Sequence, residues 1–132
     1  MTGLDTNVLV RFLTQDDPIQ SPRAGRIIEH QLTERNPGFI SLTTMFETAW
    51  VLEKVYKLSD QEVADAIRSI LQIETLFIQN EQEVYTAAHA LRTGRGSFAD
   101  ALIGALGTWA GCASTLTFDR KASRLQGFEL IA

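Results

Sequence analysis

The sequence predicts an α/β fold in which helices cover both faces of a parallel β-sheet. Short apolar stretches alternate with longer segments whose apolar residues recur every three or four positions. The first pattern is typical of buried strands and the second of amphipathic helices, and their alternation favours parallel βαβ units. No repeat or low-complexity segment interrupts the pattern. We therefore expect one domain over residues 1–132, with a five-stranded sheet in the order 3-2-1-4-5.

Composition limits the classes of protein to consider. The chain has 132 residues, of which 45% are hydrophobic and 21% charged, which is enough for a real core. No apolar run has the length of a membrane span and the N-terminus has no signal-type segment, so we expect a cytoplasmic protein without membrane contact. The net charge of −4 disfavours nucleic acid as a partner. If metal neutralises four of the 16 acids, however, the remaining acids only balance the 12 bases.

Three strands and four helices are expected in the first part of the chain. Pro18 after Asp17 favours the start of a helix, and the Asn-Pro-Gly sequence at 36–38 favours its end. Ser59 and Glu62 have the spacing of a capping box, which predicts the start of another helix. The helix over 43–56 has Phe46, Trp50, Val51 and Val55 at helical spacing. The expected strands are 2–5, 39–41 and 75–78, and the expected helices begin at residues 6, 18, 43 and 60.

The sequence from residue 81 onward predicts two helices followed by two strands. A helix over 81–92 leads through a glycine-flanked turn at 93–96 into a second helix that ends near 111. A strand over 114–118, a short helical turn over 120–125 and a last strand over 128–131 follow. The second helix carries one charge, Asp100, in its first turn. A carboxylate against a core needs a partner, which is either the helix N-terminus or a metal ion.

Four acids are expected to meet at one edge of the sheet. Asp5 follows the first strand and Asp119 the fourth, and these strands are central neighbours in the expected order. Ligands of open parallel sheets bind beyond the carboxyl ends of such strands, where the winding reverses. Glu47 and Asp100 lie in the first turns of helices that begin at the same end. Each acid alone has an alternative interpretation as a helix cap.

A cluster of ionised carboxylates requires a counter-charge. Two of them ~4 Å apart repel by about 4 kcal/mol at an effective dielectric of 20. Protons or cations must therefore fill the cluster, and Mg²⁺ or Mn²⁺ suits an all-oxygen site. Without a histidine base or a nucleophilic serine or cysteine nearby, this site predicts hydrolysis by metal-activated water. Thr117 would add a hydroxyl, or be an ordinary strand residue.

Basic residues near this edge are candidates for substrate phosphate contacts. Arg95 lies in the glycine-flanked turn, and Arg120 and Lys121 follow Asp119 directly. Such side chains position a phosphate backbone. For any one of these bases taken alone, an ordinary solvated surface position is the favoured interpretation.

The chain resembles the PIN-domain family, and within it the VapC-type ribonuclease toxins of bacterial toxin–antitoxin pairs. The resemblance runs along the chain in family order: 4–11, Glu47 with 50–52, 98–103 and 117–119. It implies that Asp5, Glu47, Asp100 and Asp119 bind metal, with Thr6, Asn7 and Thr117 in support. It further implies Mg²⁺- or Mn²⁺-dependent cleavage of RNA, a homodimer, and inhibition by a cognate VapB-type antitoxin.

Other functions compete with a nuclease. A non-enzymatic phospho-acceptor domain needs an acceptor acid after the third strand, where this chain has Gln79 and Asn80. A phosphatase with Asp5 as nucleophile needs a second acid two residues later, where this chain has Asn7. A binding module of the same α/β fold remains a further alternative, although the four acids favour retained chemistry.

Overall fold

The computed structural model describes residues 1–132 and contains six α-helices and five short strands. The N-terminal elements are β1 (Thr2–Gly3), α1 (Thr6–Thr14), α2 (Gln20–Arg26), the π-helical turn η1 (Ile27–Gln31), β2 (Gly38–Ile40), α3 (Leu42–Lys54), α4 (Asp60–Leu71) and β3 (Leu76–Ile78). The C-terminal elements are α5 (Glu81–Arg92), α6 (Phe98–Trp109), β4 (Thr115–Thr117), the 3₁₀ turn η2 (Ala122–Arg124) and β5 (Phe128–Leu130).

The predicted α/β class is confirmed, but the strand order differs in one place. Strands β1, β2 and β3 form a parallel sheet with β2 in the centre, and β4 and β5 form a second parallel pair. The expected neighbours 3-2-1 and 4-5 are therefore present, whereas the expected pairing of β1 with β4 is absent. The prediction of one continuous five-stranded sheet is not met within a single chain.

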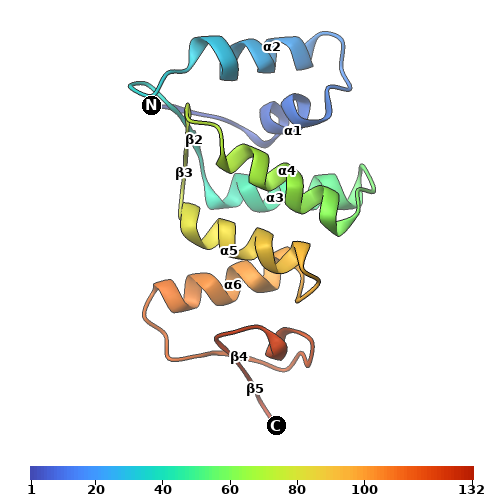
Figure 1. Ribbon diagram of the computed structural model, residues 1–132, viewed down its shortest axis with the longest axis vertical. Coiled ribbons are helices and arrows are strands. Elements are labelled where there is room, and N and C mark those ends of the chain that lie inside the picture. The colour runs from blue at the N-terminus through green and yellow to red at the C-terminus, as the bar shows by residue number, and fades with distance from the viewer.

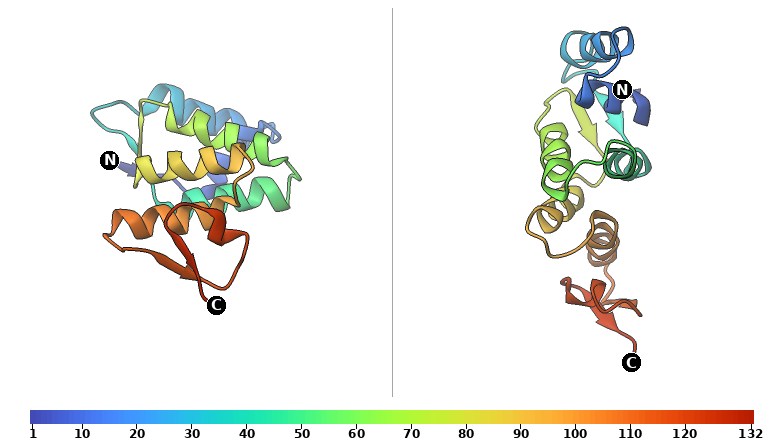
Figure 2. Two further views of the ribbon diagram at one scale, coloured as in Figure 1. Left: turned by 60° about the horizontal axis from the view of Figure 1, so that its bottom comes forward. Right: turned by 90° about the vertical axis from the view of Figure 1, so that its right-hand side faces the viewer.

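The reason for the split lies in how the helices stack. Figure 1 shows α1 and α2 at one end of an elongated molecule and the β4–β5 pair at the other, with α3 to α6 between them. Both views of Figure 2 place β4 and β5 beyond α6, apart from the three-stranded sheet. One hydrophobic core runs through these helices and includes Leu9, Leu52, Ile67, Ala88 and Leu102. This packing holds β4 away from β1.

Serine side chains begin three of the helices. Ser59 and Glu62 make the predicted reciprocal capping box of α4. Ser41 caps α3 by accepting the backbone N–H of Thr44, so the alternative interpretation of Glu47 as part of a helix cap is wrong. Ser97 caps α6 by accepting the N–H of Asp100.

The buried face of α3 is not the one that helical spacing predicted. The fully or nearly fully buried residues are Met45, Thr48, Ala49 and Leu52. Phe46, Trp50 and Val55 from the expected stripe are exposed instead. An adjacent stripe therefore packs into the core, and large apolar side chains remain on the surface.

Small residues in α6 let the last two strands approach closely. A Cβ atom on Gly104 would lie 2.5 Å from the ring of Phe128, and one on Gly107 would lie 2.5 Å from the hydroxyl of Thr115. A larger residue at either position would force the facing side chain to move, so the two glycines allow α6 and the β4–β5 pair to lie this close. No helix in the structure is both long enough and apolar enough to cross a membrane.

Candidate metal site

Two of the four predicted acids come together in one surface hollow. Asp5 follows β1 and Glu47 lies in the second turn of α3, and both line a hollow of about 380 Å³. The predicted supporting residues Thr6 and Asn7 line it as well. The sequence therefore predicted four residues that line this hollow, and they come from two segments that lie 40 residues apart in the chain: Asp5, Thr6, Asn7 and Glu47.

Thr6 connects the two acids directly. Its backbone N–H donates to Oδ1 of Asp5 at 2.7 Å, which makes Asp5 the N-cap of α1. Its hydroxyl donates to Oε1 of Glu47 at 2.5 Å. Because Thr6 is itself buried, it holds both carboxylates in fixed positions at the edge of the fold. The capping role expected as an alternative for Asp5 is thus real, and it leaves Oδ2 of Asp5 without a hydrogen bond from the protein.

The hollow also contains residues that sequence reasoning did not assign to it, among them Arg11 and Tyr56. Arg11 donates to Asp16 at 3.0 Å, and the Tyr56 hydroxyl donates to the same carboxylate at 2.6 Å. Asp16 therefore satisfies the guanidinium, and the acids of the hollow do not. The four-residue spacing of Asn7 and Arg11 in α1 was the available signal, because it places them on one face of the helix.

The other two predicted acids lie elsewhere in the chain. Asp100 is partly buried in the first turn of α6 and does not line this hollow. Asp119 is exposed after β4, where its N–H donates to the hydroxyl of Thr117 at 3.0 Å and its Oδ1 accepts from the N–H of Lys121 at 2.8 Å. Thr117 and Asp119 are therefore joined as expected, but the structure does not bring them to Asp5.

The predicted substrate-binding bases also separate into two places. Arg120 and Lys121 are exposed beside Asp119. Arg95 instead lines a different cavity, of about 700 Å³, that is bounded by α5, α6 and Arg124. None of these bases forms an ion pair within the chain.

The acids of the hollow suit a hard cation but do not complete its coordination. None of the four predicted acids forms a salt bridge. Asp5 and Glu47 supply carboxylate oxygens, which Mg²⁺ and Mn²⁺ prefer. No three acidic, histidine or cysteine side chains of one chain converge on a common point. The hollow therefore offers two carboxylate donors to a cation and no third acidic, histidine or cysteine side chain.

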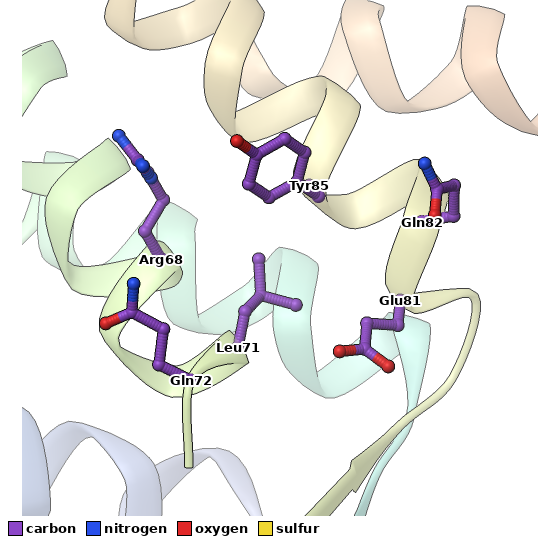
Figure 3. A pocket seen from close by; sticks show the side chains of 6 residues that line it. All are labelled: Arg68, Leu71, Gln72, Glu81, Gln82 and Tyr85. Atoms are coloured by element: carbon purple, nitrogen blue, oxygen red, sulfur yellow. The ribbon is translucent and has the colours of Figure 1, made fainter. Parts of the chain in front are cut away.

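A second hollow, of about 600 Å³, lies between α4 and α5 (Figure 3). The guanidinium of Arg68 stands 5.8 Å from the centre of the Tyr85 ring there. Its lining contains none of the predicted site residues: Arg68, Leu71, Gln72, Glu81, Gln82 and Tyr85. With one acid and one base, it does not resemble a site for a cation.

Comparison with known protein families adds to this geometry. The PIN domain matches residues 4–127, which is nearly the whole chain. The chain belongs to the PIN-domain family. PIN domains are in general metal-dependent nucleases that bind RNA, so a nuclease-like role and a divalent metal ion are expected of this PIN domain. No curated protein matches the chain.

Proposed function

We propose that this PIN domain is a Mg²⁺- or Mn²⁺-dependent endoribonuclease that hydrolyses RNA phosphodiester bonds with metal-activated water. The observation that carries the proposal is that Thr6 binds the carboxylates of both Asp5 and Glu47. The resemblance to the family implies metal-binding acids at these two positions. Neither carboxylate forms a salt bridge with a basic side chain. Two carboxylates that the same residue holds, neither with a basic partner, favour a cation beside them.

Each polar residue has a role in the proposed reaction. Asp5 and Glu47 would hold the ion. The resemblance implies Asp100 and Asp119 as further ligands, and both lie outside the hollow that Asp5 and Glu47 line. A bound divalent ion lowers the pKa of a water ligand and stabilises charge on the phosphorus. Thr6 orients Glu47 by its hydrogen bond, and Thr117 supports the turn that presents Asp119.

Substrate phosphates would be held by bases close to these acids. Arg120 and Lys121 follow Asp119 and have no carboxylate partner within the chain. Arg95 would contact RNA further from the reacting phosphate, because it lines the α5–α6 cavity. Such contacts position an RNA backbone without reading its sequence.

The biological role that we propose is that of a toxin of the VapBC type. The support is the resemblance in residues 4–11, 98–103 and 117–119. A toxin of this type would act in the cytoplasm as a homodimer, and a cognate VapB-type antitoxin would inhibit it by covering the acidic residues.

The proposal is tested by incubating the purified protein with RNA and MnCl₂ or MgCl₂. We expect cleavage that EDTA abolishes and that the Asp5→Asn variant lacks. Asp60→Asn is the matched control, because Asp60, like Asp5, is an exposed acid at the N-terminal end of a helix but lies outside the site. Cleavage by Asp5→Asn at the wild-type rate, or no cleavage of any RNA with either ion, would refute the proposal.

A further inference from the structure

A polar cavity of about 700 Å³ lies outside the candidate metal site. Helices α5 and α6 form two of its walls, and residues 124–126 form the third. Figure 1 shows the two helices side by side, joined by the short turn at 93–97. A volume of this size holds a small organic group such as a nucleotide. None of the four predicted acids lines the cavity, so it supplies no ligand for the proposed metal ion.

Two arginines from distant segments of the chain border this cavity. Arg95 lies in the turn between the helices, where its backbone N–H donates to the carbonyl of Ala90 at 3.0 Å. Arg124 lies in η2. A Cβ atom built on Gly96 would lie 2.8 Å from Cδ1 of Leu125, so the turn that carries Arg95 packs directly against the residue that follows Arg124. The fold therefore brings the two basic residues to one place.

The two guanidinium groups have no anion within the chain. Neither Arg95 nor Arg124 forms a salt bridge, and both residues are exposed. A guanidinium suits phosphate particularly well, because its planar fork donates two parallel hydrogen bonds to phosphate oxygens. In a chain with a net charge of −4, two unpaired arginines at one cavity favour a phosphate group as part of its ligand.

The interior of the cavity is suited to a flat group with both apolar and polar atoms. Ala90, Ala101 and Leu125 are nearly fully buried and supply its apolar surface. The small alanine side chains leave room that larger residues would fill. Hydrogen-bonding side chains line the rest of the cavity: Thr86, His89, Thr108 and Gln126.

One acid, Glu83, lines the cavity as well. Its Oε1 accepts from the side-chain amide of Asn80 at 3.0 Å, which holds the carboxylate near the start of α5. Glu83 forms no salt bridge, and an ionised carboxylate can only accept hydrogen bonds. It lies two turns of α5 before Ala90, about 10 Å along the helix axis. A ligand whose phosphate lies at Arg95 must therefore present hydrogen-bond donors some distance from that phosphate.

We propose that this cavity binds one nucleotide of the RNA substrate and selects its base. The phosphate would lie between Arg95 and Arg124, and the base would enter the cavity with an amino group directed at Glu83. Cytosine, adenine and guanine carry an exocyclic amino group and uracil does not, and acidic side chains accept from such groups. Unpaired bases that are splayed out of an RNA strand are commonly recognised in this way. The inference rests on the proposed function for the class of substrate, and it adds a base preference.

Binding of labelled oligocytidylate, oligoadenylate and oligouridylate tests the base preference. Fluorescence anisotropy is measured in EDTA, so that no RNA is cleaved. The wild type should bind the first two about 10-fold more tightly than oligouridylate, which is the order of discrimination that one good base contact gives. Glu83→Gln should lose most of this preference, because an amide both donates and accepts. Glu81→Gln is the matched control and should keep it, because Glu81 lies in the same first turn of α5 but outside the cavity.

Substitution of the arginines tests the phosphate contact. Arg95→Gln and Arg124→Gln should each weaken the binding of all three oligonucleotides about 10-fold, as expected for a lost hydrogen bond to a charged group. The slope of log affinity against log salt concentration should become shallower by about 0.7, the value for one phosphate contact of a single strand. Arg23→Gln is the control, because Arg23 is equally exposed and unpaired but lies in α2 at the far end of the molecule (Figure 1).

A bulky residue tests whether the base enters the cavity. Thr86→Phe should fill the cavity without a change of charge, since Thr86 is exposed in α5 and donates only to the carbonyl of Gln82. We expect this variant to lose the base preference. Ser69→Phe is the matched control, because Ser69 is also exposed and donates to a carbonyl of its own helix, but lies outside the cavity.

Equal affinities of the wild type for the three oligonucleotides would overturn the proposal. A preference that both Glu83→Gln and Thr86→Phe retain, or unchanged binding by both arginine variants, would overturn it as well. A wild type that cleaves RNA but binds the oligonucleotides without preference would refute the base pocket and leave the nuclease intact. Base-selective binding that Glu83→Gln loses, in a protein that cleaves no RNA, would refute the nuclease and leave the pocket intact.

Discussion

The hydroxyl of Thr6 donates a 2.5 Å hydrogen bond to Oε1 of Glu47, which lies 41 residues further along the chain. The backbone N–H of the same residue binds Asp5 at 2.7 Å. One threonine therefore sets the position of two carboxylates that come from different elements. A residue that binds no metal itself can in this way decide how well a cation is held.

Replacing Thr6 by valine should weaken cation binding. Thr6→Val keeps the β-branched shape and the backbone N–H, and loses only the donor to Glu47. We expect the affinity for Mn²⁺ to fall about 10-fold, as is typical when a hydrogen bond to a metal ligand is lost. The free energy of unfolding should fall by about 1 kcal/mol, since Glu47 is exposed and can bind water instead. Calorimetric titration and urea unfolding measure the two effects.

Thr6→Ser serves as the control for this change because it retains a hydroxyl at the same position. Its affinity for Mn²⁺ should remain close to that of the wild type. Equal affinities of the wild type and Thr6→Val would show that the bond to Glu47 has no part in binding the ion.

Substitutions of Asp5 should separate its structural role from its chemical role. Asp5 accepts the N–H of Thr6 as the N-cap of α1, and asparagine caps helices about as well as aspartate. Asp5→Asn should therefore unfold at nearly the wild-type urea concentration without metal, whereas Asp5→Ala should lose about 1 kcal/mol. Both variants should lose RNA cleavage. Equal destabilisation of the two variants would indicate that the charge, and not the cap, stabilises the fold.

Local signals predicted most of the elements of this fold. The helix over 81–92 has the expected bounds, and the capping box of Ser59 and Glu62 is present. Helix caps and apolar periodicity act within a few residues, so one sequence contains them. The pairing of β1 with β4 depends on how whole helices stack, and no local pattern encodes it. For the same reason spacing alone did not distinguish Met45 from Phe46 as the core residue of α3.

The candidate site was predictable where chain neighbours determine it. Asp5 and Asp119 both follow strands, as the alternation of elements indicated, and both cap the turn that comes next. Glu47 reaches Asp5 because α3 packs close to α1, as its position in the first turns of a helix that begins at the same edge of the sheet indicated. Asp5 and Asp119 lie apart because β1 and β4 belong to two separate sheets. No pattern within a few residues of the sequence predicts this separation.

Divalent cations should stabilise the folded protein. An ion that binds only the native state adds about 2.7 kcal/mol at 100 times its dissociation constant, which corresponds to a rise in Tm of several degrees for a domain of this size. We expect MnCl₂ to raise the Tm of the wild type and not that of Asp5→Asn. NaCl at equal ionic strength is the control for charge screening. An equal rise in both proteins would place the bound ion outside the hollow.

The stability of the protein should depend on Asp16 in a defined range of pH. Hydrogen bonds from Tyr56 and Thr14, with Arg11 beside them, lower the pKa of Asp16 to about 2. In the unfolded chain its pKa is about 3.9, so the ionised form stabilises the fold fully above that value. This contribution disappears as the pH falls toward 2. The difference in unfolding free energy between the wild type and Asp16→Asn should be constant from pH 7 to 5 and should then shrink. Because Tyr56 contributes most to the lowered pKa of Asp16, Tyr56→Phe should raise the lower limit of this pH range and reduce the difference. A difference that does not change with pH would contradict this explanation.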